Sequence, residues 1–483
     1  MVINQNKREM KKIILLVALA TIANLTFGKA PWENGKLKVS ENGRYLQHEN
    51  GEPFFWLGDT GWLLFQRLNR DQVKQYFENR REKGFNVIQC IFFQFYTDKN
   101  VYGHAPFEPN DLTKPSHTPG KDPNDTIQYD YWDHVEYIID MAAQNGIYLA
   151  IVPTWRDLVK RDDKLTPQIA ESFAAHLANY FKNKPNIIWV NGGSANPDDK
   201  TEIWKTIGAT LKKNAPDHLV TFHPFGRMQS SDWFQNSTWL DVNMFASGHR
   251  NYQQDNSTNK YGEDNWRYAL DDLSKTPIKP TLDGEPSYED LPQGLHDPIQ
   301  PYWNASDVRR YAYWSVFAGS CGHVYGQNSV RQVHIAGVNK AESGAKFSFF
   351  EALDAPGSFQ MQHVKNLILS RPYFERVNDQ SVVSGDEGEK YDRILVTRGK
   401  DYLMAYTYTG REFTIQMGKI SGEKVNAWWY DTRTGEACKI GEFNNIGTVR
   451  FDPPGTKYNG NDWVLVLDNA EKMFSKPGVV KSI

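Results

Sequence analysis

Residues 54–93, FFWLGDTGWLLFQRLNRDQVKQYFENRREKGFNVIQCIFF, contain one complete β-α-β pattern. The apolar runs 54–57 and 87–93 have the length of buried strands, and the amphipathic stretch 70–83 between them has the period of a helix. Asn69 occupies the position of a helix N-cap, and Gly84 follows the helix where a C-terminal glycine is common. The stretch therefore predicts two parallel strands joined by a right-handed helical crossover.

The same alternation continues along most of the chain. Six further strands are expected at 147–152, 187–190, 219–222, 242–245, 281–282 and 323–325, and further helices at 132–144, 167–181, 201–213 and 306–317. Repeated β-α units predict parallel strands, and eight strand candidates predict closure into a (β/α)8 TIM-like barrel. The connection between the fifth and sixth strands is the weakest, because residues 226–238 have no clear helical pattern.

The pattern changes near residue 376. Short β-type runs separated by turns follow, at 394–397, 402–408, 413–417, 425–430, 448–451 and 463–467. Such runs predict a small all-β sandwich. The expected domains are therefore a signal peptide over 1–30, a (β/α)8 catalytic domain over 31–375 and a β-sandwich over 376–483.

The first thirty residues carry an export signal. Lys11 and Lys12 precede the apolar run 13–20, and the small residues Gly28 and Ala30 follow it. This is the order of a secretory signal peptide, so a periplasmic or secreted protein is expected. A signal anchor is the alternative, although the apolar run is too short for a stable membrane span.

Composition limits the classes of partner. The net charge of −3 gives no basic footprint for nucleic acid. The aromatic content of 13% supplies rings that serve either as core or as platforms for sugar faces. Three cysteines without CxxC spacing, and no clustered histidines, predict neither a disulfide framework nor a metal site, and no cofactor is expected.

The active site of a (β/α)8 barrel lies at the C-terminal ends of its strands. Polar and aromatic residues follow the predicted strands, and we expect substrate contacts from Asp59, Trp62, Gln94, Trp155, Asn191, His223, His249, Tyr325 and Asn328. Structural roles are the alternative: Asp59 as a helix cap or a brace for other side chains, and the two histidines as satisfied hydrogen-bonding groups.

Glu285 is the leading catalytic candidate. It follows the seventh strand, between Gly284 and Pro286. Sugar hydrolysis with retention requires a carboxylate nucleophile about 5 Å from a carboxylic general acid. Strands four and seven face each other across a barrel and can supply such a pair. A structural ion pair is the alternative role for Glu285.

Several segments together give the chain a family resemblance. They are 55–62 (FWLGDTGW), 186–190 (NIIWV), 283–286 (DGEP), 322–326 (GHVYG) and 371–374 (RPYF). In this combination the chain resembles the apiosidase-type glycoside hydrolases, glycoside hydrolase family 140. The segments 428–435 (WWYDTRTG) and 451–455 (FDPPG) resemble a domain type labelled as collagen-binding. The resemblance covers nearly all of the mature chain.

The resemblance implies an exported bacterial enzyme that acts on apiose-containing side chains of the pectin rhamnogalacturonan II. It implies Glu285 as the nucleophile and an acid/base aspartate in a Gly-Gly-Asp pattern after the fourth strand. Here the pattern reads Gly192-Gly193-Ser194. A serine hydroxyl is too weak an acid to protonate a leaving sugar oxygen at neutral pH.

Three explanations of Ser194 stay open. The register is different, or Asp198 or Asp199 supplies the proton, or this member is weakened or uses another donor. Asp198 and Asp199 have a structural alternative as N-terminal charges of the helix that begins near Thr201.

The main hypothesis is a glycoside hydrolase with a carboxylate nucleophile and an oligosaccharide or polysaccharide substrate. A carbohydrate-binding protein on a degenerate hydrolase barrel is the alternative, motivated by Ser194. A collagen or protein binder is a third hypothesis, supported only by the label of the C-terminal domain. Linkage, endo or exo action, stereochemical outcome and oligomeric state are not fixed by the sequence.

Overall fold

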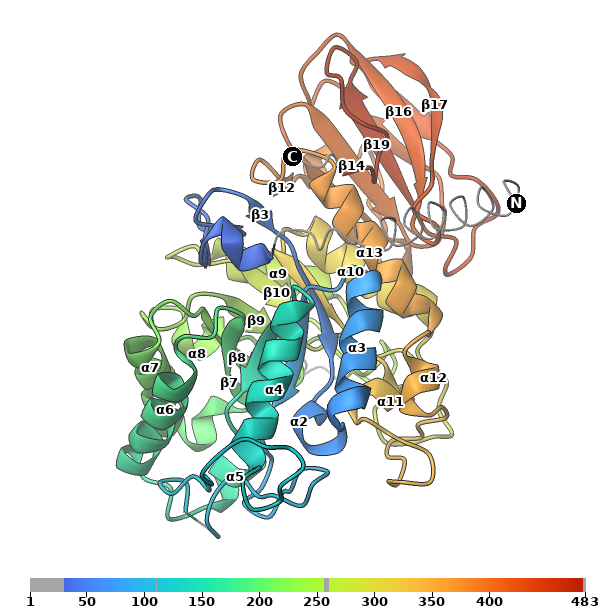
Figure 1. Ribbon diagram of the computed structural model, residues 1–483. Helices are drawn as coiled ribbons and strands as arrows, with labels where there is room; N and C mark the ends of the chain where they lie inside the picture. Colours follow the sequence, from blue (N-terminus) through green and yellow to red (C-terminus); the bar gives the residue numbers. More distant parts are fainter. Residues whose placement is uncertain (1–29, 110, 256–259, 481–483) are drawn as a thin grey trace, which may run out of the picture.

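The computed structural model describes residues 30–109, 111–255 and 260–480 (Figure 1). A parallel eight-stranded barrel surrounded by helices comes first, and antiparallel all-β sheets follow it in the chain. The predicted fold class is therefore confirmed. Apart from Ala30, the predicted signal peptide lies outside the described residues. No helix in the described ranges is long and apolar enough to cross a membrane.

The barrel sheet has the strand order β8-β7-β6-β5-β4-β11-β10-β9. Its strands are β4 (Trp56–Thr60), β5 (Val87–Ile91), β6 (Tyr148–Val152), β7 (Ile187–Ala195), β8 (Val220–Pro224), β9 (Asn243–Phe245), β10 (Thr281–Asp283) and β11 (Gly322–Tyr325). Because parallel strands are covered on both faces, every residue of these strands is buried except Ser194. Ser194 is therefore the point on the barrel strands that is partly accessible to solvent.

The barrel closes between β8 and β9 through few contacts. One parallel bridge joins Thr221 to Val242, and the Thr221 hydroxyl donates to the Val242 carbonyl at 2.7 Å. The Asp241 carboxylate accepts the backbone N–H of Val220 at 2.8 Å. The connection between these strands contains only α8 (Ser231–Phe234), which explains why its sequence has no clear helical pattern.

Seven longer helices surround the barrel and the interface with the all-β part (Figure 1). They are α3 (Arg70–Glu82), α4 (Tyr131–Gln144), α6 (Pro167–Phe181), α7 (Thr201–Asn214), α9 (Asn265–Ser274), α10 (Ala305–Phe317) and α13 (Pro356–Leu369). Short helices occupy the loops: α2 (Leu64–Arg67), α5 (Arg156–Arg161), α11 (Asn328–Arg331) and α12 (Phe349–Ala352), with 3₁₀ turns η1 (Pro31–Asn34) and η2 (Pro197–Asp199). Asn69 caps α3 as the sequence predicts, accepting the N–H of Gln72 at 3.0 Å.

A small antiparallel sheet, which the sequence did not predict, precedes the barrel. It consists of β1 (Leu37–Val39), β2 (Leu46–His48) and β3 (Pro53–Phe54). Phe54 belongs to this sheet, so the barrel strand begins only at Trp56 and the predicted limits 54–57 are wrong. The predicted strand 87–93 ends at Ile91, because Phe92 instead packs against Trp132 and Phe181, with ring centroids 5.6 and 5.5 Å away.

The C-terminal part contains two antiparallel sheets. One has the order β12 (Val377–Asn378), β13 (Ile394–Arg398), β14 (Tyr402–Thr407), β19 (Trp463–Asn469), β16 (Lys424–Asp431) and β17 (Ala437–Asn444), and the other pairs β15 (Phe413–Gln416) with β18 (Thr448–Phe451). The 3₁₀ turns η3 (Gln380–Val382) and η4 (Lys390–Asp392) lie between the first strands. All of β14 is buried: Leu403 and Ala405 face the second sheet, while Met404 and Tyr406 belong to the core shared with the barrel.

The helix α10 is buried between the two parts, without an exposed face from Val308 to Phe317. Arg309 donates two hydrogen bonds to Asp462, at 3.0 and 2.6 Å. Tyr313 stacks on Tyr406 with ring centroids 4.8 Å apart. Apolar packing and a buried ion pair therefore fix the all-β part against the barrel.

Candidate active site

Glu285 lies two residues past β10, at the C-terminal end of the barrel. It lines a cavity of about 260 Å³, which we call the inner cavity. Its side chain is 15% exposed. The inner cavity is lined by Arg156, Ser194, Phe225, Gly226, Arg227, Gly248, His249, Arg250, Glu285, Gly294, Leu295 and His296. Because Ser194 is the penultimate residue of β7 and Glu285 follows β10, residues from the ends of the fourth and seventh barrel strands line one cavity, as the sequence predicts for a catalytic pair.

Three donors surround the Glu285 carboxylate. The Tyr288 hydroxyl donates to Oε1 at 2.9 Å, the Nε2 atom of His249 lies 3.5 Å from Oε1, and the Nε2 atom of His223 lies 3.6 Å from Oε2. Burial alone raises the pKa of a carboxyl group, but the hydrogen bond from His249 and the proximity of His223 lower the pKa of Glu285 to about 2. Glu285 is therefore ionised at neutral pH, as a carboxylate nucleophile must be.

His223 links Glu285 to Ser194. The backbone N–H of Ser194 donates to Nδ1 of His223 at 2.9 Å. Nδ1 is therefore the unprotonated nitrogen, and the proton of the neutral ring is on Nε2, which faces Glu285. Burial lowers the pKa of His223, although the Glu285 carboxylate opposes this effect, so the neutral ring is favoured.

The end of β7 departs from regular strand geometry around Ser194. The register between β7 and β8 shifts between Asn191 and Ala195, which is a bulge of the kind often found beside active sites. Gly192, Gly193 and Ser194 all have positive φ, with Ser194 at 53°. A non-glycine residue in this region is uncommon, and Asp and Asn tolerate it better than most. Residue 194 is thereby turned towards the inner cavity.

A larger cationic cavity adjoins the inner one. This outer cavity, about 710 Å³, shares Arg156 and Phe225 with it and is otherwise lined by Asp157, Val159, Lys160, Arg161, Ala195, Asn196, Lys200, Trp204 and Met228. Its described lining has four cationic side chains and one carboxylate. The guanidinium of Arg156 lies over the Phe225 ring at 4.8 Å, at the boundary between the two cavities.

Two of the predicted aromatic residues lie near the Glu285 carboxylate. Trp62 and Trp155 pack edge to face with centroids 5.3 Å apart, and the His223 ring lies 5.3 Å from Trp62. The Tyr288 hydroxyl, which donates to Glu285, is buried on the same side of the site. Trp155 is partly exposed, so its ring can contact a ligand.

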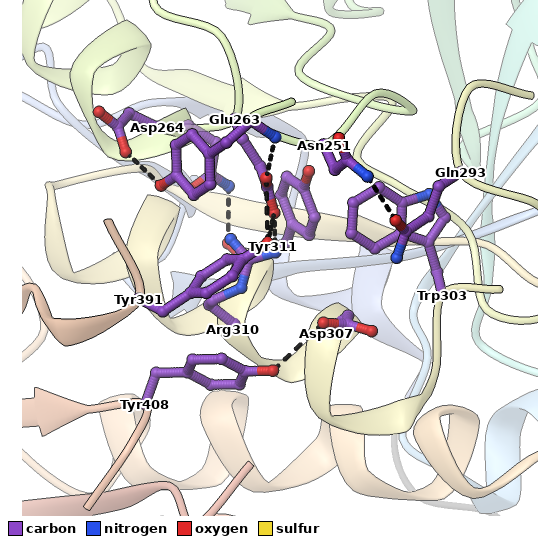
Figure 2. A network of polar contacts seen from close by, with 12 residues as sticks. Asn251, Glu263, Asp264, Gln293, Trp303, Asp307, Arg310, Tyr311, Tyr391 and Tyr408 are labelled. Atoms are coloured by element: carbon purple, nitrogen blue, oxygen red, sulfur yellow. Dashed lines mark hydrogen bonds and ion pairs between the residues drawn. The ribbon is translucent and has the colours of Figure 1, made fainter. Parts of the chain in front are cut away.

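The segment that carries His249 is fixed from two sides. The His249 carbonyl accepts the indole N–H of Trp303 at 3.2 Å and the backbone N–H of Gly294 at 2.8 Å. Two residues further on, the Asn251 amide donates to Gln293 at 2.6 Å (Figure 2). His249 is thus held to the loop that forms the opposite wall of the inner cavity.

The same segment reaches the all-β part through Glu263 (Figure 2). Glu263 is fully buried, pairs with Arg310 of α10 and accepts the N–H of Tyr252 at 2.9 Å. The Tyr391 hydroxyl, from the all-β part, donates to Glu263 at 3.2 Å. The C-terminal part therefore contacts the far end of the loop that begins with His249.

Of the predicted contact residues, His249 lines the inner cavity, whereas Trp62, Trp155 and His223 lie behind its lining and others are turned elsewhere. Asp59 is buried and accepts hydrogen bonds from Tyr76 at 2.7 Å and Arg80 at 2.6 Å, so it braces α3. The Tyr325 hydroxyl donates to buried Glu289 at 2.6 Å. These residues follow strands as expected, but their side chains bind protein groups.

The remaining candidates likewise have protein partners. The Asn191 amide donates to the carbonyl of Trp204 at 2.7 Å, the Asn328 amide donates to backbone carbonyls at 2.8 and 3.0 Å, and Gln94 forms a turn by donating its N–H to Asp98 at 2.6 Å. Asp198 lies in η2, where it accepts the indole N–H of Trp233 at 2.6 Å, and it does not line either cavity.

Three residues at the site were missed by the sequence analysis. Tyr288 donates to Glu285, Arg331 of α11 interacts electrostatically with Glu285 and Tyr288, and Arg156 separates the two cavities. Tyr288 stands three residues after Glu285 and Arg156 follows Trp155, so proximity to the leading candidates was the available signal. Among the described side chains, no group of three His, Cys, Asp or Glu could hold a metal ion.

Comparison with known families decides the identity of this barrel. The family model for the apiosidase-like catalytic domain matches residues 40–375, well over half of the chain. This chain belongs to the apiosidase-like glycoside hydrolase family. A second model, "Putative collagen-binding domain of a collagenase", matches residues 377–468. No curated protein matches the chain in sequence.

Solved structures agree with the apiosidase-like assignment. A protein described as a glycoside hydrolase is 46% identical, with a TM-score of 0.87 over 92% of this chain and 100% of the other. A glycoside hydrolase family 5 protein from Bacteroides vulgatus ATCC 8482 is 45% identical, with a TM-score of 0.88 over 94% of this chain and 98% of the other. The chain is thus similar to glycoside hydrolases along nearly its whole length.

Proposed function

We propose that this enzyme cleaves apiose-containing side chains of the pectin rhamnogalacturonan II, with Glu285 as the nucleophile. The observation that carries the proposal is an ionised glutamate at a barrel strand end, in a cavity lined by cations. The carboxylate attacks the anomeric carbon and forms a glycosyl-enzyme ester, and water then releases the sugar. His223, His249 and Tyr288 hold the carboxylate oxygens in position for this attack.

The charge of the two cavities supports an acidic substrate. The cations Arg156, Lys160, Arg161 and Lys200 surround the outer cavity, where Asp157 is the one carboxylate among the described lining residues. A pectin fragment carries uronic acid carboxylates, which arginine can bind in a bidentate manner. The outer cavity is large enough for sugar units beyond the one that is cleaved, and Trp155 offers a ring for a sugar face.

The direct test is sugar release from rhamnogalacturonan II oligosaccharides, with chromatographic identification of the product. We expect the wild type to release apiose or an apiose-containing oligosaccharide, and Glu285→Gln to release none. Because binding to the outer cavity is ionic, KM is expected to rise with salt. Full activity of Glu285→Gln on a substrate that the wild type cleaves would refute the proposal.

Ser194 favours a second candidate function, a carbohydrate-binding protein on a hydrolase barrel that has lost its acid. The same assay separates the two. The carbohydrate-binding function would be favoured if the wild type binds the oligosaccharides but releases no sugar. The comparison is made at enzyme and substrate concentrations at which Ser194→Asp does release sugar.

The proposal also covers the role of the C-terminal part, the limits of the domains and the location of the protein. We propose that the all-β part over 376–483 buttresses the catalytic domain over 31–375, which the Arg309–Asp462 pair and the Tyr391–Glu263 contact support. We also propose export to the periplasm or medium after removal of residues 1–30. Failure of residues 377–483 to bind collagen would agree with a buttress and disagree with a collagen binder.

A further inference from the structure

The inner cavity has one carboxylate where a retaining mechanism uses two. Among the described residues that line it, Glu285 is the sole acidic side chain. Ser194 occupies the strand end across from Glu285, on a backbone with φ of 53° that an aspartate also tolerates. The residue of β7 that faces the inner cavity, Ser194, therefore does not supply the second carboxyl group of the reaction.

Among the side chains that the structure describes, which do not include that of Asp199, nearby carboxyl groups do not replace it. Asp198 is outside both cavities on Trp233, and Asp157 faces the outer cavity, within 3.5 Å of Arg161. Asp283 is fully buried behind Glu285, where Ser247 and Asn265 donate to it. Glu289 is buried and is bound by Tyr325 and by a backbone N–H of α13.

The space in front of Ser194 has the chemistry of a carboxylate site. Nη1 of Arg156 donates to the Ser194 carbonyl at 2.8 Å and lies 3.5 Å from the Ser194 hydroxyl. The Arg156 side chain is 36% exposed, and its Nε atom forms an ion pair with Asp157 at 3.9 Å, which is too long for a hydrogen bond. A guanidinium and a hydroxyl thus face one side of the inner cavity, while Glu285 faces the other.

We propose that a carboxylate from outside the chain binds between Arg156 and Ser194 and acts as the acid/base of the reaction. It is either a free carboxylic acid or the uronic acid carboxyl of the substrate itself. The inference rests on the proposed function, because it assumes that Glu285 forms a glycosyl-enzyme. It assigns Arg156 as the residue that binds the carboxylate, and Ser194 as the residue whose small side chain leaves room for it.

The two half-reactions balance with this group. In the first, the bound carboxylic acid gives its proton to the glycosidic oxygen, the bond from the anomeric carbon to that oxygen breaks, and a Glu285 oxygen bonds to the anomeric carbon. In the second, the carboxylate takes a proton from water, the water oxygen bonds to the anomeric carbon, and the ester bond to Glu285 breaks. Both carboxyl groups return to their starting states.

The charges of the site change in the direction that this cycle needs. Before attack, the negative Glu285 favours the protonated form of a neighbouring carboxyl group. Once Glu285 is an ester its charge is gone, and the cation of Arg156 then favours the ionised form, which is the base. An acid/base group of the chain itself would be subject to the same alternation.

The test uses a 4-nitrophenyl apioside, whose leaving group needs little protonation and which has no carboxylate. We expect sodium formate to accelerate turnover by the wild type saturably, by about tenfold or more, against sodium chloride at equal ionic strength. Arg156→Gln is expected to lose the saturation, while Lys205→Gln, which removes a cation from the outer face of α7, is expected to keep it. Ser194→Asp is expected to be faster by about 10²–10⁴-fold on natural oligosaccharides and to be insensitive to formate.

The source of the natural carboxylate is distinguished in a second arm. Oligosaccharides that keep their uronic acids are compared with the same oligosaccharides after carboxyl reduction. If carboxyl reduction abolishes cleavage and formate restores it, the natural acid/base is the substrate's own carboxyl group. If cleavage depends on formate with both the native and the reduced oligosaccharides, it is a free acid. Glu285-dependent turnover that responds neither to formate nor to Ser194→Asp would overturn the inference and leave the proposed function standing. Absence of Glu285-dependent release in every variant would refute both.

Discussion

Replacing Tyr288 by phenylalanine should raise the pKa of Glu285, the proposed nucleophile. The Tyr288 hydroxyl donates to Glu285 at 2.9 Å from a fully buried position. A hydrogen bond to a charged group contributes about 1.5–3 kcal/mol, and about 1.4 kcal/mol corresponds to one pKa unit. Tyr288→Phe should therefore move the pKa of Glu285 from about 2 to about 3–4.

The shift is visible in the acid limb of the pH profile of kcat/KM. Because Glu285 reacts only when ionised, activity falls as the pH drops through its pKa, so the limb should lie about one to two units higher in the variant. The assay is initial release of 4-nitrophenol from an apioside in chloride without formate, because formate would titrate in the same pH range. Each sample is quenched in alkali after brief exposure to its pH. Recovery of activity on return to neutral pH excludes acid denaturation.

Tyr325→Phe is the matched control. It removes the same hydroxyl from a tyrosine that donates to Glu289, which does not line the inner cavity. Its acid limb should coincide with that of the wild type. An acid limb of Tyr288→Phe within about 0.3 units of the wild type would refute the assignment of Tyr288 as a donor that stabilises the charge of Glu285.

Other parts of the structure give three further predictions. Burial raises the pKa of Asp283 from 3.8 to about 7, so the folded state keeps a proton that the unfolded chain loses. The free energy of unfolding should therefore fall as the pH rises from about 4 to 7, by at most about 1.4 kcal/mol per pH unit. Asp283→Asn should flatten this slope in urea unfolding, and equal slopes would contradict the shift. Asp462→Asn leaves the buried Arg309 without its charge partner and should lower the free energy of unfolding by about 3–5 kcal/mol; a change below about 0.5 kcal/mol would show that the pair does not hold the two parts together. Trp155→Ala should lower kcat/KM on oligosaccharides about tenfold, and an unchanged value would remove the ring from the binding site.

Periodicity predicts the barrel well because both faces of a parallel strand are buried, so each strand is a short apolar run followed by an amphipathic helix. The limits of strands are less predictable. Phe54 and Phe92 are as apolar as the strands beside them, but one joins the N-terminal sheet and the other packs between helices. Local sequence does not distinguish these environments, because they depend on elements far along the chain.

The sequence predicts which residues follow the barrel strands. It does not predict the direction in which each of their side chains points. Glu285, His223 and His249 follow strands and do converge. Asp59 and Tyr325 follow strands too, but both are fixed to protein partners. The direction of a side chain at a strand end is set by bulges such as that at Ser194 and by partners such as Arg80, which the spacing of residues does not reveal.

Mass spectrometry of the protein during turnover shows whether Glu285 forms the proposed bond to the sugar. We expect Glu285 to become covalently bound to the sugar, and release to be slow when no carboxylate acts as base. The wild type is incubated with the 4-nitrophenyl apioside in chloride alone, quenched in acid and digested. We predict that one sugar residue is attached to the peptide that contains Glu285, and that the adduct disappears after addition of formate. Sugar release at the same rate without an adduct, or an adduct on a different peptide, would contradict the account.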